Sequence, residues 1–335
     1  MKPKLKIYFT DFWPVFDMQK NIFVDLLSEK FELIISPEDP DYLFFSIFGH
    51  EFNKYKCTRI FFSGESIKPD FKECDYAFSC YPNTSDGRNY RLPQYYQYGD
   101  MAELIKKQKP EKLLASKTKF CNFIYSNPSC KKRNEFFKKL TKYKKVDSAG
   151  RFMNNIERGI GSTPQDKWEF MRPYKFTISF ENEKIEHYTT EKIYEAMKVN
   201  SIPIYWGNPK IEADFNTSSF LNYYDYGSDE ALIEKIIELD NNDDEYMKML
   251  SQPWFKNNEV NKFLRKDSIL GQFDKIFSNQ INPIGLNSPY YTNNPLTRFF
   301  GINRTKLTYL RKNLSRKIKY FSWQKVVMKF KSKLR

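Results

Sequence analysis

The sequence predicts an α/β protein with two domains that contain parallel sheets. Residues 1–110 alternate short apolar segments with a helical segment, which is the pattern of a layered α/β fold. Residues 174–209 contain a strand, a loop, a helix and a second strand, and two strands joined through a helix lie parallel. A charged stretch with a proline, residues 106–119, separates the two regions, and 335 residues are enough for two ordinary domains.

The first expected domain, residues 1–110, opens with a strand at residues 5–9 and a helix at residues 21–27. β-Branched and aromatic residues indicate four further strands, at residues 31–35, 42–47, 59–63 and 76–80. Asp39, Pro40 and Asp41 imitate a D-x-D metal motif. The proline and the apolar strand that follows at once predict a turn there instead.

The second expected domain, residues 117–261, begins with a strand at residues 120–125 and a helix that runs to residue 143. Helical periodicity predicts later helices at residues 230–239, 244–250 and 262–277. We expect residues 262–297 to form a C-terminal helix that crosses back to the first domain.

The helix inside residues 174–209 starts at a place suited to an anion. Thr190 is an acceptable N-cap, and Lys192 lies in the first turn, where the helix dipole disfavours a cation but favours phosphate. A lysine facing a bound anion explains this position, and a solvated surface lysine is an equally open alternative. The polar residues of the same loop are Glu181, Asn182, Tyr188 and Glu191.

Two other charged residues follow predicted strands. Arg133 comes after the strand at residues 120–125 and near a helix start, again where phosphate binds, although a surface arginine is the alternative. Glu65 follows Gly64 at the carboxyl end of the strand at residues 59–63, where a carboxylate can accept a proton from a hydroxyl. Position alone favours a surface or helix-capping glutamate at 65.

The formal charge of +14 is located in a C-terminal tail. Residues 298–335 contain 13 basic residues and no acidic ones, whereas the other 297 residues carry 42 basic and 41 acidic groups. Apolar residues at helical spacing among these basic residues predict an amphipathic helix that binds an anionic membrane surface. A partner helix or nucleic acid is the alternative, and the neutral body disfavours a nucleic-acid-binding protein.

The remaining composition disfavours metal and disulfide chemistry. Five cysteines without a C-x-x-C pair predict reduced thiols in a cytosol, and two histidines disfavour a histidine triad or a multi-histidine metal site. The apolar segments are too short to cross a bilayer, and the interrupted N-terminal segment predicts a first strand rather than a signal peptide.

Ordered motifs over residues 40–225 resemble the α-1,3/4-fucosyltransferases, glycosyltransferase family 10, bacterial type. The main set is F-E-N at 180–182, Tyr188, T-E-K at 190–192 and I-P-I-Y-W-G-N-P at 202–209. The supporting segments are S-G-E at 63–65, C-D-Y-A-F at 74–78, Y-R-L-P-Q-Y-Y at 90–96 and S-N-P-x4-R-N-E-F-F at 126–137. Ser66 and Ile67 stand where the family often has Asn-Glu, so a helper carboxylate is in doubt.

The resemblance implies a GT-B fold, in which two Rossmann-like domains face a central cleft. It implies inverting transfer of L-fucose from GDP-fucose to a hydroxyl of N-acetylglucosamine in an acceptor containing galactose-N-acetylglucosamine; O3 is the expected hydroxyl, and O4 stays open. The lack of a convincing D-x-D motif further predicts that no cofactor or metal is obligatory. Glu65 would be the general base. The donor-binding residues would be Arg133, Asn182, Tyr188, Glu191 and Lys192.

The biological setting and the donor are expectations of the same kind. The basic tail and the resemblance together imply a cytoplasmic enzyme at the inner face of the cytoplasmic membrane that acts in lipopolysaccharide, Lewis-antigen or protein glycosylation. A related transferase that uses another nucleotide sugar is the alternative, because phosphate contacts do not identify the sugar.

Overall fold

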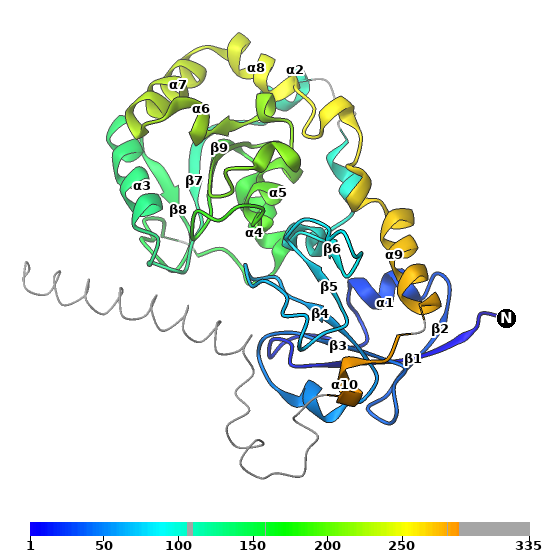
Figure 1. Cartoon of the computed structure of the whole chain (residues 1–335). Coiled ribbons are helices and arrows are strands. Elements are labelled where there is room, and N and C mark those ends of the chain that lie inside the picture. Colours follow the sequence, from blue (N-terminus) through cyan, green and yellow to red (C-terminus); the bar gives the residue numbers. More distant parts are fainter. Residues whose placement is uncertain (106–109, 158, 280, 288–335) are drawn as a thin grey trace, which may run out of the picture. The chain divides into compact units, whose positions relative to one another are not determined.

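The chain forms two compact units in the computed structural model, which describes residues 1–105, 110–157, 159–279 and 281–287 (Figure 1). The first unit contains residues 1–97 together with the described residues from Lys262 onward, and the second contains residues 98–261. The tail at residues 298–335, predicted to be a basic amphipathic helix, lies outside the described residues.

The boundary lies at Gln97, before the charged stretch of residues 106–119 that was expected to separate the two domains. The reason is the short helix η3 (Met101–Leu104), which packs against α5 (Glu191–Lys198) of the second unit. Met101 is buried, and Glu103 pairs with Lys198. The charge pattern predicted a boundary in the charged stretch itself. Packing instead assigns residues 98–105, which precede that stretch, to the second unit.

The first unit contains a six-stranded parallel sheet in the order β2-β1-β3-β4-β5-β6. Its strands are β1 (Lys4–Thr10), β2 (Glu32–Ile35), β3 (Tyr42–Phe45), β4 (Thr58–Phe62), β5 (Tyr76–Ser79) and β6 (Asn89–Arg91). Its helices are α1 (Ile22–Leu27), η1 (Glu51–Lys54), η2 (Gln94–Tyr98, which reaches the boundary), η7 (Lys262–Leu264), α9 (Lys266–Ser278) and α10 (Ile284–Asn287). The five predicted strands are confirmed with small shifts at their ends, whereas β6 was not predicted because it is only three residues long.

Both faces of this sheet are buried, which explains its nearly continuous apolar strands. Phe44 and Phe62 lie in a core with α1 and α9, while Phe45 and Phe61 lie in a second core on the other face. Phe273 of α9 stacks on Phe78 of β5, with ring centroids 4.7 Å apart. The predicted C-terminal helix therefore packs within the core of the first unit.

The second unit contains a five-stranded parallel sheet in the order β11-β10-β9-β7-β8. Its strands are β7 (Lys119–Phe123), β8 (Val146–Ser148), β9 (Tyr174–Phe180), β10 (Ile202–Trp206) and β11 (Leu221–Asn222). Its α-helices are α2 (Pro110–Leu114), α3 (Lys131–Tyr143), α4 (Pro164–Met171), α5, α6 (Tyr223–Tyr226), α7 (Asp229–Asn241) and α8 (Asp243–Ser251). Its other short helices are η3, η4 (Ile211–Ala213), η5 (Thr217–Ser219) and η6 (Lys256–Asn258).

Helices cover both faces of the second sheet, with α3 and α7 on one side and α4 and α5 on the other (Figure 1). The alternation in β9 follows from this arrangement. Phe180 contacts Phe136 of α3, with ring centroids 4.8 Å apart, whereas Ser179 donates to the carbonyl of Lys192 in α5 at 3.1 Å. The polar residues Thr177 and Ser179 of β9 are therefore buried and hydrogen-bonded rather than solvated.

The strand order reverses between β7 and β9. From β7 the chain moves outward to β8, and from β9 it moves the other way through β10 to β11. In an open parallel sheet, ligands bind at the carboxyl ends of the strands beside such a reversal. The helices that start there are α3 and α5, which carry the predicted residues Arg133 and Lys192.

Candidate active site

Arg133 is completely buried at the start of α3 and is held on three sides. Its Nη1 donates to Asn182 Oδ1 at 2.8 Å, and its Nη2 donates to the carbonyl oxygen of Asn127 at 2.5 Å. The guanidinium carbon lies 3.9 Å from the ring centroid of Tyr125, within the range of a cation–π contact. Arg133 and Asn182, both predicted as donor-binding residues, thus meet across the reversal between β7 and β9.

One guanidinium nitrogen of Arg133 has no partner in the described part of the chain. Its Nε is buried and has no hydrogen-bond partner among the residues that the structure describes. A buried guanidinium with an unused N–H is suited to an anion, because charge-assisted hydrogen bonds are strong in surroundings of low polarity.

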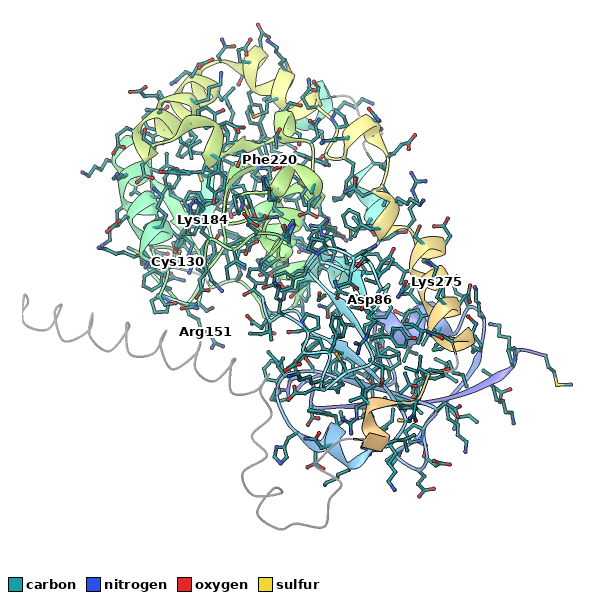
Figure 2. All side chains as sticks on the ribbon, viewed as in Figure 1. Asp86, Cys130, Arg151, Lys184, Phe220 and Lys275 are labelled. Atoms are coloured by element: carbon teal, nitrogen blue, oxygen red, sulfur yellow. The ribbon has the colours of Figure 1, made fainter. Side chains whose placement is uncertain are left out.

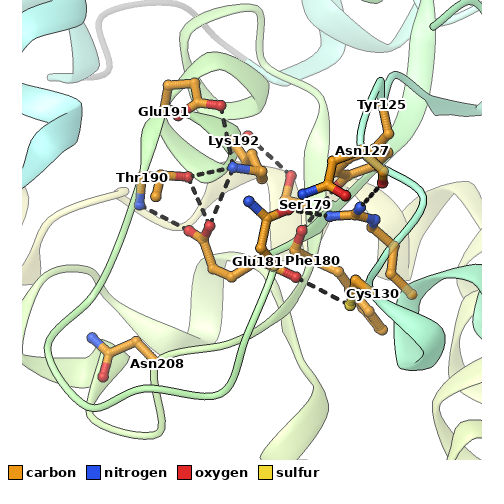
Figure 3. Close-up of polar contacts among 12 residues, drawn as sticks. Tyr125, Asn127, Cys130, Ser179, Phe180, Glu181, Thr190, Glu191, Lys192 and Asn208 are labelled. Atoms are coloured by element: carbon orange, nitrogen blue, oxygen red, sulfur yellow. Dashed lines mark hydrogen bonds and ion pairs between the residues drawn. The ribbon is translucent and has the colours of Figure 1, made fainter. Parts of the chain in front are cut away.

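Lys192 faces two carboxylates of the protein itself (Figure 3). Its Nζ lies 3.3 Å from Glu181 Oε2 and 3.2 Å from Glu191 Oε1, and it donates to Thr190 Oγ1 at 2.8 Å. The Lys192 side chain is 15% exposed. Lys192 is therefore not a solvated surface residue. Its anionic partners are two carboxylates of the protein, which hold the ammonium in place.

Thr190 differs from the prediction that it caps α5. It precedes the helix, but its side chain makes no capping hydrogen bond. Its hydroxyl donates to Glu181 Oε2 at 2.7 Å, and its backbone N–H donates to Glu181 Oε1 at 2.8 Å. The carboxylate of Glu181 thus satisfies the start of α5 from outside the helix.

The charges of this cluster follow from burial and pairing. Burial raises the pKa of the Glu181 carboxyl, and Lys192 offsets only part of this shift. Burial also acts on Lys192, but the Glu191 and Glu181 carboxylates outweigh it and raise the pKa of the ammonium. For Glu191, burial is outweighed by Lys192 and Lys167, which lower the pKa of this carboxyl. At neutral pH Lys192 is therefore a cation and Glu191 an anion.

Further residues fix the loop between β9 and α5. Cys130 donates through Sγ to the carbonyl of Glu181 at 3.5 Å. Figure 2 shows Cys130 in the same region of the second unit as Lys184, which belongs to the loop. Asn208 accepts from the backbone N–H of His187 at 2.8 Å through Oδ1. Tyr188 is 4% exposed, so its ring is almost completely buried. Its predicted role in orienting the donor stays a prediction.

Sequence reasoning missed several residues that build this site. Tyr125 lies under Arg133 and donates to the carbonyl of Ile178 at 2.7 Å, but an isolated tyrosine gave no signal. Glu181 was named in the loop but was given no role, and Asn208 lies inside the quoted motif W-G-N-P, so both could have been chosen. Gly207 is needed because a Cβ there would lie 2.4 Å from Glu181 Cγ.

Glu65 lies in the first unit, after the carboxyl end of β4 as predicted. Its backbone N–H donates to Ser63 Oγ at 3.0 Å, and the backbone N–H of Ile67 donates to its carbonyl at 2.7 Å. These bonds form a tight turn, and Glu65 is half-buried in it. The five donor-side residues all lie in the second unit, and the roles assigned to them and to Glu65 stay predictions.

Neither a metal centre nor a membrane span is found in the described part of the chain. Within residues 1–105, 110–157, 159–279 and 281–287, no three His, Cys, Asp or Glu side chains are grouped so as to hold a metal ion. Within the same residues no helix has the length and apolarity needed to cross a membrane.

Two family models match the chain. A model of the N-terminal domain of alpha-(1,3)-fucosyltransferase FucT matches residues 7–98, and a model of the C-terminal part of glycosyltransferase family 10 (fucosyltransferase) matches residues 114–276. The chain belongs to glycosyltransferase family 10. The predicted family is therefore confirmed, and the two models divide the chain close to its two units.

This family 10 chain has curated relatives that are longer than itself. It is 27% identical over 290 residues to alpha-(1,3)-fucosyltransferase FucT of Helicobacter pylori. This match covers 74% of this chain and 60% of the relative. It is 30% identical over 196 residues to the putative fucosyltransferase R654 of Acanthamoeba polyphaga mimivirus. This match covers 56% of this chain and 32% of that protein. The chain thus spans less than two thirds of the length of either relative.

Solved structures of the family match more of their length. The crystal structure of an alpha1,3-fucosyltransferase with GDP-fucose has a TM-score of 0.69 and 27% identity, covering 84% of this chain and 93% of that one. A second crystal structure of an alpha1,3-fucosyltransferase has a TM-score of 0.71 and 26% identity, and the match covers 86% of this chain and 93% of that one. The family 10 chain therefore has the GT-B type of fold, with one parallel-sheet unit in each half.

Proposed function

We propose that this family 10 chain transfers L-fucose from GDP-fucose to a hydroxyl of a glycan acceptor. The observation that carries the proposal is the pair of prearranged cations, Arg133 and Lys192, at the starts of two helices beside the strand reversal. A departing nucleoside diphosphate needs positive charge placed before the reaction, because fixed charges need no reorganisation as the bond breaks. The family and the related structure with GDP-fucose support the choice of donor.

The proposed reaction inverts the configuration at the fucose anomeric carbon. The acceptor oxygen, O3 of N-acetylglucosamine next to a galactose, forms the new bond to that carbon. The bond from the carbon to the β-phosphate oxygen breaks, and its electron pair leaves with GDP. Glu65 takes the proton of the acceptor hydroxyl, Arg133 and Lys192 stabilise the pyrophosphate, and Glu191 accepts hydrogen bonds from donor hydroxyls.

Asn182 and Tyr188 are proposed to orient the donor. Asn182 already binds Arg133, so a change at residue 182 would also move the guanidinium. Four chain groups would replace the charge compensation that other glycosyltransferases obtain from a metal: the two cations and the N-terminal ends of α3 and α5. An obligatory cofactor is therefore not part of the proposal.

Residues 298–335 are proposed to bind an anionic membrane surface. The support is the sequence of this tail, which has 13 basic residues, no acidic ones and apolar residues at helical spacing. Each basic residue near an anionic leaflet contributes about 1 kcal/mol. The proposed location is the inner face of the cytoplasmic membrane, and the proposed setting is the synthesis of lipopolysaccharide or other glycans with Lewis-type structures.

The test separates donor binding from transfer. Glu65→Gln should slow transfer by about 10²–10⁴-fold, the usual contribution of a general base, and leave GDP affinity unchanged. Glu38→Gln is the matched control, because Glu38 is an exposed acid of the same unit. Transfer by Glu65→Gln at the wild-type rate would remove Glu65 from the mechanism. Hydrolysis of GDP-mannose or UDP-sugars in preference to GDP-fucose would refute the donor.

A further inference from the structure

The buried carboxylate of Glu181 depends on one cation, Lys192. The Glu181 side chain follows β9 and is 0% exposed, and its only ion pair among the described residues is with Lys192, at 3.3 Å. Its two oxygens also accept from the backbone N–H and the hydroxyl of Thr190, at 2.8 and 2.7 Å. A charged carboxylate away from water is costly without a cationic partner, so a weaker ion pair favours the neutral acid.

The other titratable groups around Glu181 keep their own charge states. Glu191 of α5 stays an anion, because its burial is outweighed by Lys192 and Lys167, which lower its pKa. The guanidinium of Arg133 in α3 uses its donors on other residues. Burial raises the pKa of three further neighbours, which are therefore neutral at pH 7: Tyr125 after β7, Cys130 before α3 and Tyr205 of β10. Burial also raises the pKa of Glu181 itself, so Glu181 is the group of this cluster that is closest to gaining a proton.

Lys192 has as many acceptors as it has N–H groups. An ammonium carries three N–H groups, and three oxygens lie around Nζ: Thr190 Oγ1 at 2.8 Å, Glu191 Oε1 at 3.2 Å and Glu181 Oε2 at 3.3 Å. A pyrophosphate oxygen that binds Lys192 therefore competes with one of them, and the contact with Glu181 is the longest. The phosphates also bring negative charge towards a carboxylate that water does not reach.

The contact between Glu181 and Thr190 can hold a proton in either direction (Figure 3). Glu181 Oε2 and Thr190 Oγ1 lie 2.7 Å apart, and a threonine hydroxyl can donate as well as accept. In the free protein this hydroxyl donates to Glu181 and accepts from Lys192. Once Lys192 binds a phosphate instead, the hydroxyl is able to accept from a protonated Glu181 Oε2 over the same distance.

We propose that binding of the nucleotide sugar is coupled to the uptake of a proton by Glu181 at Oε2. The proton comes from water, the diphosphate replaces the Glu181 charge beside Lys192, and the neutral acid donates to Thr190. Glu181 is thus a positioning residue, which holds Lys192 in the free protein and yields it to the donor. The inference rests on the proposed function, because it assumes that a diphosphate binds Lys192.

The experiment counts protons as GDP-fucose binds without an acceptor. Both phosphates of GDP-fucose are esterified, so this donor has no group of its own that titrates near neutral pH. Calorimetric titrations of the wild type between pH 6 and pH 9, in buffers of different ionisation enthalpy, should show a net uptake of up to one proton per donor. The Kd should rise with pH by up to about tenfold per unit, because the complex holds more protons than the free protein.

Glu181→Gln carries the neutral form permanently, since its amide can accept from the Thr190 N–H and donate to the Thr190 hydroxyl. This variant should remove the proton uptake and the pH dependence of the Kd, and at pH 9 it should bind GDP-fucose at least as tightly as the wild type. A purely structural role of Glu181 predicts weaker binding at every pH and an unchanged uptake. Glu186→Gln, which changes an exposed acid of the same loop, is the matched control and should behave as the wild type.

Infrared difference spectra identify the protonated group even if Glu181→Gln does not fold. Addition of GDP-fucose to the wild type should produce the C=O band of a protonated carboxyl group, and Glu191→Gln should keep this band. No proton uptake by the wild type, uptake without this band, uptake that persists in Glu181→Gln, or loss of the band in Glu191→Gln would overturn the coupling. A wild-type protein that does not bind GDP-fucose would instead overturn the proposed function, and the coupling with it.

Discussion

The buried lysine Lys117 should make the stability of the second unit depend on pH. Lys117 is 6% exposed, and its Nζ donates to the carbonyls of Arg172 at 2.6 Å and Val199 at 2.8 Å. Arg172 and Val199 are the C-caps of α4 and α5, so this single amine ties together the ends of two helices. A neutral amine has two N–H groups, which is the number that these two carbonyls need.

Burial, with a smaller contribution from the positive charge of Arg172, lowers the pKa of Lys117 to about 7. The unfolded chain keeps a pKa near the usual 10.4 for lysine, so between these values the unfolded state binds one more proton. Stability therefore rises with pH in this window, by about 1.4 kcal/mol per pH unit where the difference is one full proton. Below pH 7 both states are protonated, and the cost of burying the charge is fully present.

The comparison of Lys117→Met with the wild type isolates this contribution. Between pH 7.5 and pH 9.5 the free energy of unfolding of the wild type should rise by about 2 kcal/mol relative to Lys117→Met. The measurement is urea unfolding at several pH values, in which the buried tyrosines contribute equally to both proteins. Lys119→Met, which changes an exposed lysine two residues along, should follow the wild type. Parallel pH curves for the wild type and Lys117→Met would refute the reasoning.

The remaining predictions concern the donor site, a buried ion pair, metal and the tail. Arg133→Lys should raise the dissociation constant of GDP, measured by calorimetry, about tenfold or more, because lysine cannot keep the contacts with Asn182, Asn127 and Tyr125. Wild-type affinity for GDP would contradict the phosphate role of Arg133. Asp229→Asn should destabilise the second unit by about 1–3 kcal/mol in urea unfolding, because this carboxylate is 6% exposed and pairs with two lysines, Lys132 and Lys139. An unchanged urea midpoint would show that these ion pairs contribute nothing to stability. Fucosyl transfer should be undiminished in EDTA, because the chain supplies the cations, and a strict manganese requirement would count against this expectation. Deletion of residues 298–335 should abolish sedimentation with anionic vesicles and preserve transfer, whereas a truncated protein that still sediments would refute the anchor.

The sequence by itself determined the order and type of the main elements. Alternating and helical periodicities are local properties, so the strand, helix and second strand expected within residues 174–209 correspond to β9, α5 and β10. Parallel topology followed from the helix between strands, and this topology placed Arg133 and Lys192 at one edge of one sheet. The ordered motifs also determined the family, because their residue types and spacings can be compared without a structure.

Only the tertiary structure decided what these residues contact. Lys192 faces Glu181 and Glu191, and Arg133 lies on Tyr125, because β7 and β9 are neighbours in the sheet. Gln94 reaches Gly64 across 30 positions of sequence, which no periodicity encodes. Such contacts depend on strand register, helix orientation and burial together, and the charge state of a buried group depends on all three. The sequence therefore identified the chemistry that the chain carries, and packing selected which groups share one site and which donors and acceptors remain for a ligand.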